Sequence, residues 1–193
     1  MRADTSNDSR SRLVLTTSRL LWRQGLHGTG LQQILAESQS PRGSLYFYFP
    51  GGKEDLAVEA VQVAARLISS GIRKMLERVN MADALRSFVD MFAGEMRRSD
   101  FEQGCPVATV TLEATPESEA LRVVCEEAYN EWESLIAARL EEDGFSRRRA
   151  AQLATLTLST VEGALLLSRA RRNSEPLETI RELLVPLLQK PRR

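Results

Sequence analysis

Apolar residues recur every three to four positions along almost the whole chain, and this spacing constrains the fold more than any other feature. Over residues 54–79 the apolar side chains keep a 3.6-residue period without a break, and a second unbroken stripe runs from Leu121 to Ile136. This period describes one face of an α-helix, whereas a strand requires apolar and polar residues to alternate. The sequence therefore predicts an all-α protein with no strand.

Proline, glycine and small polar residues divide this pattern into separate helices. Ser146 is expected to cap a helix that reaches about Arg172, and Pro186 is expected to end or kink the last helix. Thr115 and Pro116 have the residue types of a cap and a first helical position. The expected helices cover residues 10–24, two short segments between 29 and 49, and then 54–79, 81–98, 106–112, 116–143, 146–172 and 174–188.

The segment Thr29–Lys53 reads as two short helices separated by a tight turn. Thr29 can cap the first helix, while Ser40 can cap the second, with Pro41 at a position where no backbone N–H is needed. Helices this short are not stable alone in water, so their neighbours must hold them. The second helix opens with small, polar and cationic residues, and this is the chemistry of a helix presented to a DNA groove.

The candidate DNA contacts divide into base contacts and phosphate contacts. Arg42 and Ser44, on the leading turn of the second short helix, are the candidates for base edges, and Gly43 allows the backbone to approach closely. Helix starts bind phosphate through free N–H groups, which favours the backbone at Thr29 and Gly30. The full set of predicted DNA contacts is Thr29, Gly30, Arg42, Gly43, Ser44, Tyr46, Tyr48 and Lys53.

Three motifs in this region resemble the helix-turn-helix of TetR-family transcriptional regulators: Thr29-x4-Ile34, Arg42-Gly43-Ser44-Leu45-Tyr46-x-x-Phe49 and Lys53-Glu54-x-Leu56. The link Pro50-Gly51-Gly52-Lys53 and the later Gly104-Cys105-Pro106-Val107-Ala108 resemble the LmrA/YxaF-like branch. The family usually has Gly or Ala near Ser38 and Gln39. The resemblance implies a three-helix DNA-binding domain, placed at residues 1–56, followed by a helical-bundle domain for ligand binding and dimerisation at residues 57–193.

Charge and composition agree with a DNA-binding region joined to a domain of another kind. Residues 1–50 hold six arginines and three acidic residues, a net charge of +3, and the remainder sums to −3 because the whole chain is neutral. No apolar run approaches the roughly 18 residues that span a bilayer, so no membrane partner is expected. The polar start MRADTSNDSRSR predicts no secretory signal, and the two cysteines make no disulfide framework, so we expect a cytoplasmic protein.

The residues of catalysis are scarce. The chain has one histidine, His27, expected in a loop, and it shows no metal-ligand cluster, no Ser-His-acid set and no Gly-rich phosphate loop. Cys105 and Cys125 can be a redox pair or two thiols packed in a helical core, and the acidic run Glu141-Glu142-Asp143 is expected to be solvated. We therefore expect no enzyme and no cofactor. The alternatives are a small all-helical enzyme or carrier, and a helical interaction module without a ligand.

The middle helices carry a set of aromatic, sulfur-containing and small polar residues that can line an apolar cavity or simply form the core. Periodicity favours the core, whereas the resemblance implies a ligand pocket for a small hydrophobic effector. The predicted pocket residues are Phe88, Met91, Phe92, Cys105, Thr111, Tyr129 and Trp132.

One helix-turn-helix contacts too few base pairs for useful affinity, so we expect a homodimer that reads a palindromic operator. Its interface is expected on the last two long helices, packed as a four-helix bundle, through Leu153, Thr157, Thr160, Val161, Ala164, Leu184 and Leu187. The sequence thus favours a transcriptional regulator, a repressor that leaves its operator when a small hydrophobic ligand binds.

Overall fold

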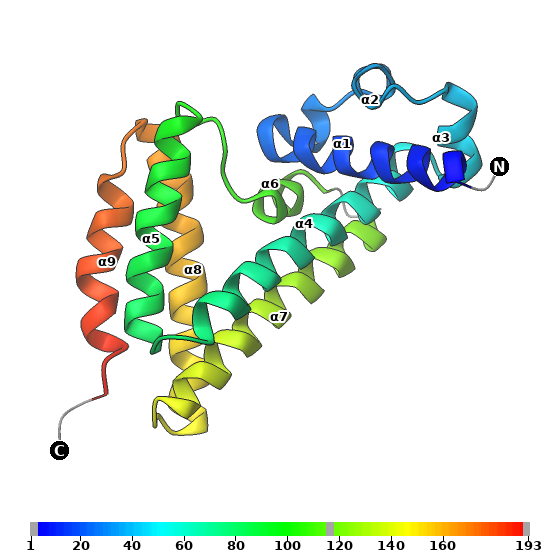
Figure 1. Ribbon diagram of the computed structural model, residues 1–193. Helices are drawn as coiled ribbons and strands as arrows, with labels where there is room; N and C mark the ends of the chain where they lie inside the picture. The colour runs from blue at the N-terminus through cyan, green and yellow to red at the C-terminus, as the bar shows by residue number, and fades with distance from the viewer. Residues whose placement is uncertain (1–3, 115–117, 191–193) are drawn as a thin grey trace. The chain divides into compact units, whose positions relative to one another are not determined.

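The computed structural model describes residues 4–114 and 118–190, and the regular structure in these ranges is entirely helical (Figure 1). The all-α prediction is therefore confirmed. Thr115 and Pro116, the expected start of one helix, lie outside the described residues. The helices are α1 (Asp4–Gly28), α2 (Leu31–Ser38), α3 (Arg42–Tyr48), α4 (Lys53–Leu76), α5 (Met81–Arg98), α6 (Pro106–Glu113), α7 (Glu119–Glu142), α8 (Arg147–Arg171) and α9 (Glu175–Leu187).

The chain forms two compact units, each made of two separate stretches of sequence. Unit 1 combines the chain up to Leu67 with Cys105–Ala128, and unit 2 combines Ile68–Gly104 with the chain from Tyr129 onward. Helices α4 and α7 therefore contribute residues to both units. The functional boundary predicted between residues 56 and 57 stays a prediction.

Unit 1 is built around α1, which packs against α2, α3 and α6. One face of α1 supplies Leu13, Val14 and Leu20 to a buried cluster, and Trp22 on the same helix is half-buried. The short helices α2 and α3 are held by burial of their apolar side chains in this cluster, since neither is long enough to be stable alone. The rest of the cluster is Ile34, Leu45, Phe49 and Leu56.

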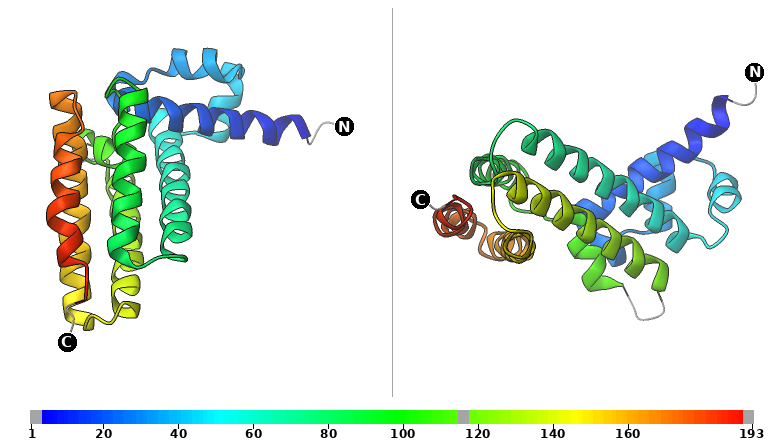
Figure 2. Two further views of the ribbon diagram at one scale, coloured as in Figure 1. Left: turned by 60° about the vertical axis from the view of Figure 1, so that its left-hand side comes forward. Right: turned by 90° about the horizontal axis from the view of Figure 1, so that it is seen from below.

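In unit 2, helices α5, α8 and α9 lie side by side, with α9 packed against both of the others (Figures 1 and 2). Helix α5 begins as predicted at Met81, where Asn80 caps it by accepting the N–H of Asp83 at 3.0 Å. Ser146 caps α8 as predicted by accepting the N–H of Arg149 at 3.4 Å, and α9 ends one residue after Pro186.

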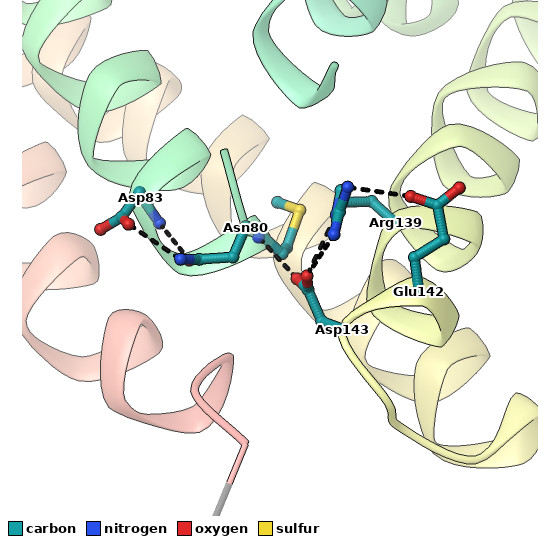
Figure 3. Close-up of polar contacts among 6 residues, drawn as sticks. Asn80, Asp83, Arg139, Glu142 and Asp143 are labelled. Carbon is teal, nitrogen blue, oxygen red and sulfur yellow. Dashed lines mark hydrogen bonds and ion pairs between the residues drawn. The ribbon is translucent and has the colours of Figure 1, made fainter. Parts of the chain in front are cut away.

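The carboxylate of Asp143 joins the end of α7 to the start of α5 (Figure 3). It accepts the backbone N–H of Met81 at 2.7 Å and two hydrogen bonds from Arg139, and its side chain is only 9% exposed. Hydrogen bonding to the Asp143 carboxylate raises the pKa of Arg139. The expectation of a solvated acidic run is therefore wrong for Asp143, because a neighbouring helix start and a cation from its own helix both engage it. A cleft of about 240 Å³ beside it is lined by Asn80, Asp83, Asp143, Leu188, Gln189 and Lys190.

Candidate nucleic-acid interface

The turn between α2 and α3 is set by one residue in the left-handed region. Gln39 has φ 51° and ψ 37°, and its N–H bonds back to the end of α2 at the carbonyl of Ala36. Only glycine adopts this conformation without cost. Ser40 donates to the carbonyl of Ser38 at 3.3 Å and does not cap α3, whose N-cap is Pro41. The expected cap at Ser40 is therefore wrong by one position.

The short helix α3 has one buried side and one open side. Leu45 and the following Phe49 are 0% and 2% exposed and anchor the helix to the core. Arg42 and Gly43, in the first turn of the helix, are both exposed, and a Cβ added at Gly43 would meet nothing within 4 Å. No described residue pairs with the Arg42 guanidinium, so its five donors are available in the fork geometry that suits guanine.

The aromatic side chains after Arg42 divide between the two sides of α3. Phe47 is 76% exposed and Tyr46 is 46% exposed, while Tyr48 is half-buried and packs edge-on against Phe47 at 4.9 Å between ring centres. Sequence reasoning missed Phe47. The signal that could have found it is its spacing from Gly43, since residues four apart share one helix face. An exposed phenyl ring on this face can contact a thymine methyl group.

The other arginines of the basic amino-terminal region are mostly engaged within unit 1. Arg12 donates its Nε to the carbonyl of Ser38 at 3.0 Å and pairs with Asp8, and Arg10 pairs with Glu59 at 2.6 Å. Arg19 lies 3.4 Å from Glu37. These contacts hold α2 and α4 against α1, so Arg42 differs from them by having no such partner among the described residues.

The predicted phosphate contacts lie at two helix starts. Gly30 is the N-cap of α2, and no side chain in the described part of the chain caps this end, which leaves the first N–H groups of the helix open. The Thr29 side chain is 0% exposed and its hydroxyl donates to the carbonyl of Gly25 at 2.6 Å. The expectation of a capping hydroxyl at Thr29 is therefore wrong, and the backbone N–H of Thr29 is also engaged, since it donates to the carbonyl of Leu26 at 3.3 Å. Ser44 is half-buried.

Lys53 is the first residue of α4 and is half-buried. Burial lowers the pKa of its ammonium group, and the nearby carboxylate of Glu113 acts in the opposite direction. A phosphate placed here would favour the charged form in the same way as Glu113 does.

The predicted effector residues fall in both units. In unit 2, Phe88 and Phe92 are half-buried and stack with ring centres 4.3 Å apart, while Met91 is 46% exposed. Tyr129 packs edge-on against Trp132 at 5.4 Å. The prediction that these residues line one cavity together with those of unit 1 stays a prediction.

Trp132 is 2% exposed and its indole N–H donates to the Ser69 hydroxyl at 3.1 Å. Ser69 in turn donates to Glu131 at 2.8 Å, and Arg73 pairs with the same carboxylate. The hydrogen bond from Ser69 first, and then Arg73, hold the pKa of Glu131 below its ordinary value.

In unit 1, Cys105 is buried, whereas Thr111 is exposed and its hydroxyl donates to the carbonyl of Val107 at 2.8 Å. Cys125 is also buried, and desolvation raises the pKa of its thiol. A raised pKa disfavours the thiolate, which is the reactive form.

Most of the predicted dimer residues are already covered within their own chain. Leu153, Thr157, Val161, Ala164 and Leu184 are at most 6% exposed. A side chain that is covered in one chain has almost no surface left to lose on association, so these residues cannot supply the area of an interface. Of the predicted set only Leu187, 46% exposed, and the half-buried Thr160 remain partly open.

A different apolar stripe is open on the same two helices. On α8, positions 156, 160, 163 and 167 lie on one face and carry Leu156, Thr160, Gly163 and Leu167. On α9 the open positions are Leu183 and Leu187, one turn apart. We call these six residues the α8–α9 stripe.

Two further observations concern other kinds of site. Among the described residues no group of three or more His, Cys, Asp or Glu side chains is placed to hold a metal ion. Helix α8 is long and apolar enough to cross a membrane by length and composition alone, a test that the core helix of a soluble protein also passes.

Comparisons with known proteins match both parts of the chain. Residues 13–60 match the family model "Bacterial regulatory proteins, tetR family", and residues 81–183 match "Transcriptional regulator LmrA/YxaF-like, C-terminal domain". The chain is 38% identical over 184 residues to the HTH-type transcriptional regulator YxaF of Bacillus subtilis, covering 95% of this chain and 96% of YxaF. It is also 38% identical to the HTH-type transcriptional regulator LmrA of the same organism, covering 95% of this chain and 98% of LmrA.

A solved structure extends the comparison to a complex with DNA. A cysteine mutant of the TetR family transcriptional regulator CifR, complexed with 26-bp double-strand operator DNA, has a TM-score of 0.77 at 21% identity and covers 92% of this chain and 95% of its own. YxaF, LmrA and the matched family are transcriptional regulators and not enzymes.

Proposed function

The chain belongs to the TetR family of bacterial transcriptional regulators, and from this premise we propose that it is a dimeric repressor that leaves its operator when a small hydrophobic ligand binds. The observation that carries the proposal is the exposure of Arg42, with which no described residue pairs, and of Phe47 on a helix anchored by Leu45 and Phe49. A rigid helix that presents a free guanidinium and an aromatic ring fits the major groove.

The proposed contacts fall into two groups. Arg42, Ser44, Tyr46 and Phe47 face base edges, with Gly43 allowing close approach. The phosphate contacts come from the backbone that follows Thr29, beginning at Gly30, where the start of α2 is uncapped, and from Tyr48 and Lys53. The complex of CifR with operator DNA supports DNA as the partner of this fold.

Binding to the DNA that flanks the protein's own gene tests this assignment. We expect fluorescence anisotropy to show tight binding that weakens steeply with salt, because each neutralised phosphate releases condensed counterions. Arg42→Ala should lose about 1–3 kcal/mol of discrimination at one base position, about 5- to 150-fold, with little change on unrelated DNA.

Arg147→Ala is the matched control, because Arg147 is exposed at the start of α8 in unit 2 and no described residue pairs with it. An equal loss for Arg42→Ala on every sequence would reassign Arg42 to phosphate. Absence of salt-dependent binding by the wild type would contradict the proposed function itself.

The proposed homodimer uses the α8–α9 stripe. A two-fold pair of α3 helices can read successive major grooves about 34 Å apart, so the operator should be palindromic. Two copies of the stripe meeting across the axis would form a four-helix bundle, since a two-fold interface joins the same patch on both chains. We also propose that the protein acts in the cytoplasm, where its operator is.

The proposed effector is small and hydrophobic, because the predicted pocket residues are mainly aromatic and sulfur-containing. It acts by binding more tightly to the form of the dimer that does not fit DNA. Electron density from crystals of protein taken directly from cells tests this, because a co-purified compound would show the pocket and its chemistry together. Density for a compound away from all of Phe88, Phe92, Tyr129 and Trp132 would contradict the predicted pocket.

A further inference from the structure

Helix α1 is interrupted near its end, in unit 1, by Gly25. This residue has φ 73° and ψ −175°, a conformation open to glycine and strained for other residues. The break withdraws the N–H groups that follow it from the normal i to i−4 pattern of the helix. The N–H groups of Leu26 and His27 instead donate to one carboxylate oxygen of Glu113, the second at 2.9 Å.

Glu113 is an unusual residue for its own helix. It is the last residue of α6, where the helix dipole disfavours a negative charge, so α6 itself gains nothing from it. The carboxylate is instead satisfied by the broken end of α1, through charge-assisted bonds of the stronger kind. It also lies directly against Gly25, because a Cβ added there would come within 2.9 Å of Oε2.

The segment that Glu113 holds leads directly to the DNA-facing start of α2. The Thr29 hydroxyl bonds back to the carbonyl of Gly25 at 2.6 Å. Gln24 donates to the carbonyl of Gly28 at 2.6 Å and to Gln33 on α2 at 2.8 Å. The break in α1 therefore determines where the uncapped N–H groups of α2 lie.

Glu113 is also linked to the second phosphate position. Its charge acts on Lys53 at the start of α4. One side chain from α6 thus acts on both predicted phosphate-binding helix starts of unit 1, and α6 also carries Thr111, one of the predicted effector residues.

We propose that Glu113 is a positioning residue for DNA binding, whose carboxylate holds the broken end of α1, and with it the start of α2, in the geometry that fits the phosphate backbone. This rests on the proposed DNA-binding function and adds the element that links α6 to it. A displacement of α6 that withdraws the carboxylate releases the Leu26 and His27 N–H groups and lowers operator affinity.

Two measurements on the full-length protein test the proposal. The first is amide hydrogen exchange of Leu26 and His27 by NMR without DNA, and the second is the Kd for the DNA flanking the protein's own gene. Glu113→Ala should speed exchange at both amides and raise the Kd about tenfold, within the usual range of coupling between sites. Glu113→Gln keeps an oxygen that accepts these N–H groups, so its Kd should recover to within about threefold of the wild type.

Glu119→Gln is the control, because Glu119 is an exposed carboxylate of unit 1 whose only ion pair among the described residues is local, with Arg122 at 2.8 Å. It should change neither measurement. If Glu113→Ala fails to fold, both measurements are made on Glu113→Asp instead. Its shorter side chain should not reach the two N–H groups, so the same changes are expected.

Unchanged amide exchange at Leu26 and His27 in Glu113→Ala would show that the Glu113 carboxylate does not hold the broken end of α1, and would overturn the proposal. Faster exchange with an unchanged Kd would overturn the positioning role, and so would a Glu113→Gln variant that binds as weakly as Glu113→Ala. If the wild type does not bind the DNA at all, while exchange responds as expected, the proposed function fails and the positioning role fails with it.

Discussion

Replacing Leu183 by glutamate should break the proposed dimer, because this residue is the most exposed leucine of the α8–α9 stripe. Leu156, Leu167, Leu183 and Leu187 are 42%, 46%, 67% and 46% exposed, so each chain leaves about two leucine side chains uncovered. Burial of a leucine is worth about 1.5–3 kcal/mol, so covering the stripe on both chains stabilises the dimer by roughly 6–12 kcal/mol. This gain must exceed the cost of association, which is about 4 kcal/mol or more.

The substitution removes this contribution twice, once in each chain. Because Leu183 is 67% exposed, the loss is roughly 2–4 kcal/mol per dimer, and the dimer Kd should rise about 30- to 700-fold. A charged carboxylate in the interface adds a desolvation cost to this loss. Sedimentation velocity over a range of concentrations measures the change, and thermal unfolding at a concentration where both proteins are monomeric shows whether the chain still folds.

Leu15→Glu is the matched control. Leu15 lies on α1 in unit 1 and is 57% exposed, so the same chemical change is made at a similarly open leucine outside the stripe. It should leave the dimer Kd unchanged. A Leu183→Glu protein that dimerises like the wild type would refute the assignment of the stripe, and a wild type that is monomeric at all concentrations would refute the dimer.

Three further predictions concern single residues. Phe47→Ala should weaken operator binding by about 1–3 kcal/mol in an anisotropy titration. The free energy of unfolding should change by less than about 0.5 kcal/mol, because the ring is 76% exposed in the free protein. A large loss of stability would instead make Phe47 a core residue. Gln39→Gly should be neutral or stabilising by up to about 1 kcal/mol in urea denaturation, because φ at this position is 51°. Gln39→Val should destabilise the protein by more than about 1 kcal/mol for the same reason. Equal effects of the two substitutions would argue against the left-handed turn. Because the pKa of Glu131 is lowered in the folded protein, its ionised carboxylate stabilises the fold above pH 4.5, the ordinary pKa of glutamate, and this stabilisation is lost as pH falls through the lowered pKa. Glu131→Gln should therefore flatten the decline of melting temperature with acid. An unchanged decline would show that Ser69 and Arg73 contribute little.

The helical pattern of the sequence predicts the elements of this fold well, because burial of one face imposes the same period in any helical protein. The helix from Met81 to Arg98 begins and ends where its periodicity predicts, and the cap at Ser146 follows from local chemistry. Periodicity does not show which neighbour covers an apolar face. The predicted interface residues Leu153 and Val161 are buried within their own chain for this reason, and the open face of α8 lies beside them.

The role of a site residue is predictable from the sequence where its residue type has one dominant use. The role is missed where a partner distant in the sequence determines what the side chain contacts. Arg42 and Gly43 are open as their position on a short polar helix start suggests. The capping role expected of Thr29 is wrong because its hydroxyl bonds to a carbonyl exposed by the break at Gly25. Glu113 and Asp143 act on backbone N–H groups 86 and 62 residues away, and nothing in their local sequence indicates such partners.

The two tryptophans of the chain give each unit its own optical reporter. Trp22 is half-buried on α1 in unit 1, and Trp132 is buried in unit 2 beside Ser69. With either indole replaced by phenylalanine, the emission of the other follows the melting of one unit alone. Coincident curves would mean that the two halves, which share α4 and α7, unfold as a single cooperative block. Separated curves would mean that one half can loosen while the other keeps its structure, which is the freedom that a ligand-controlled switch needs.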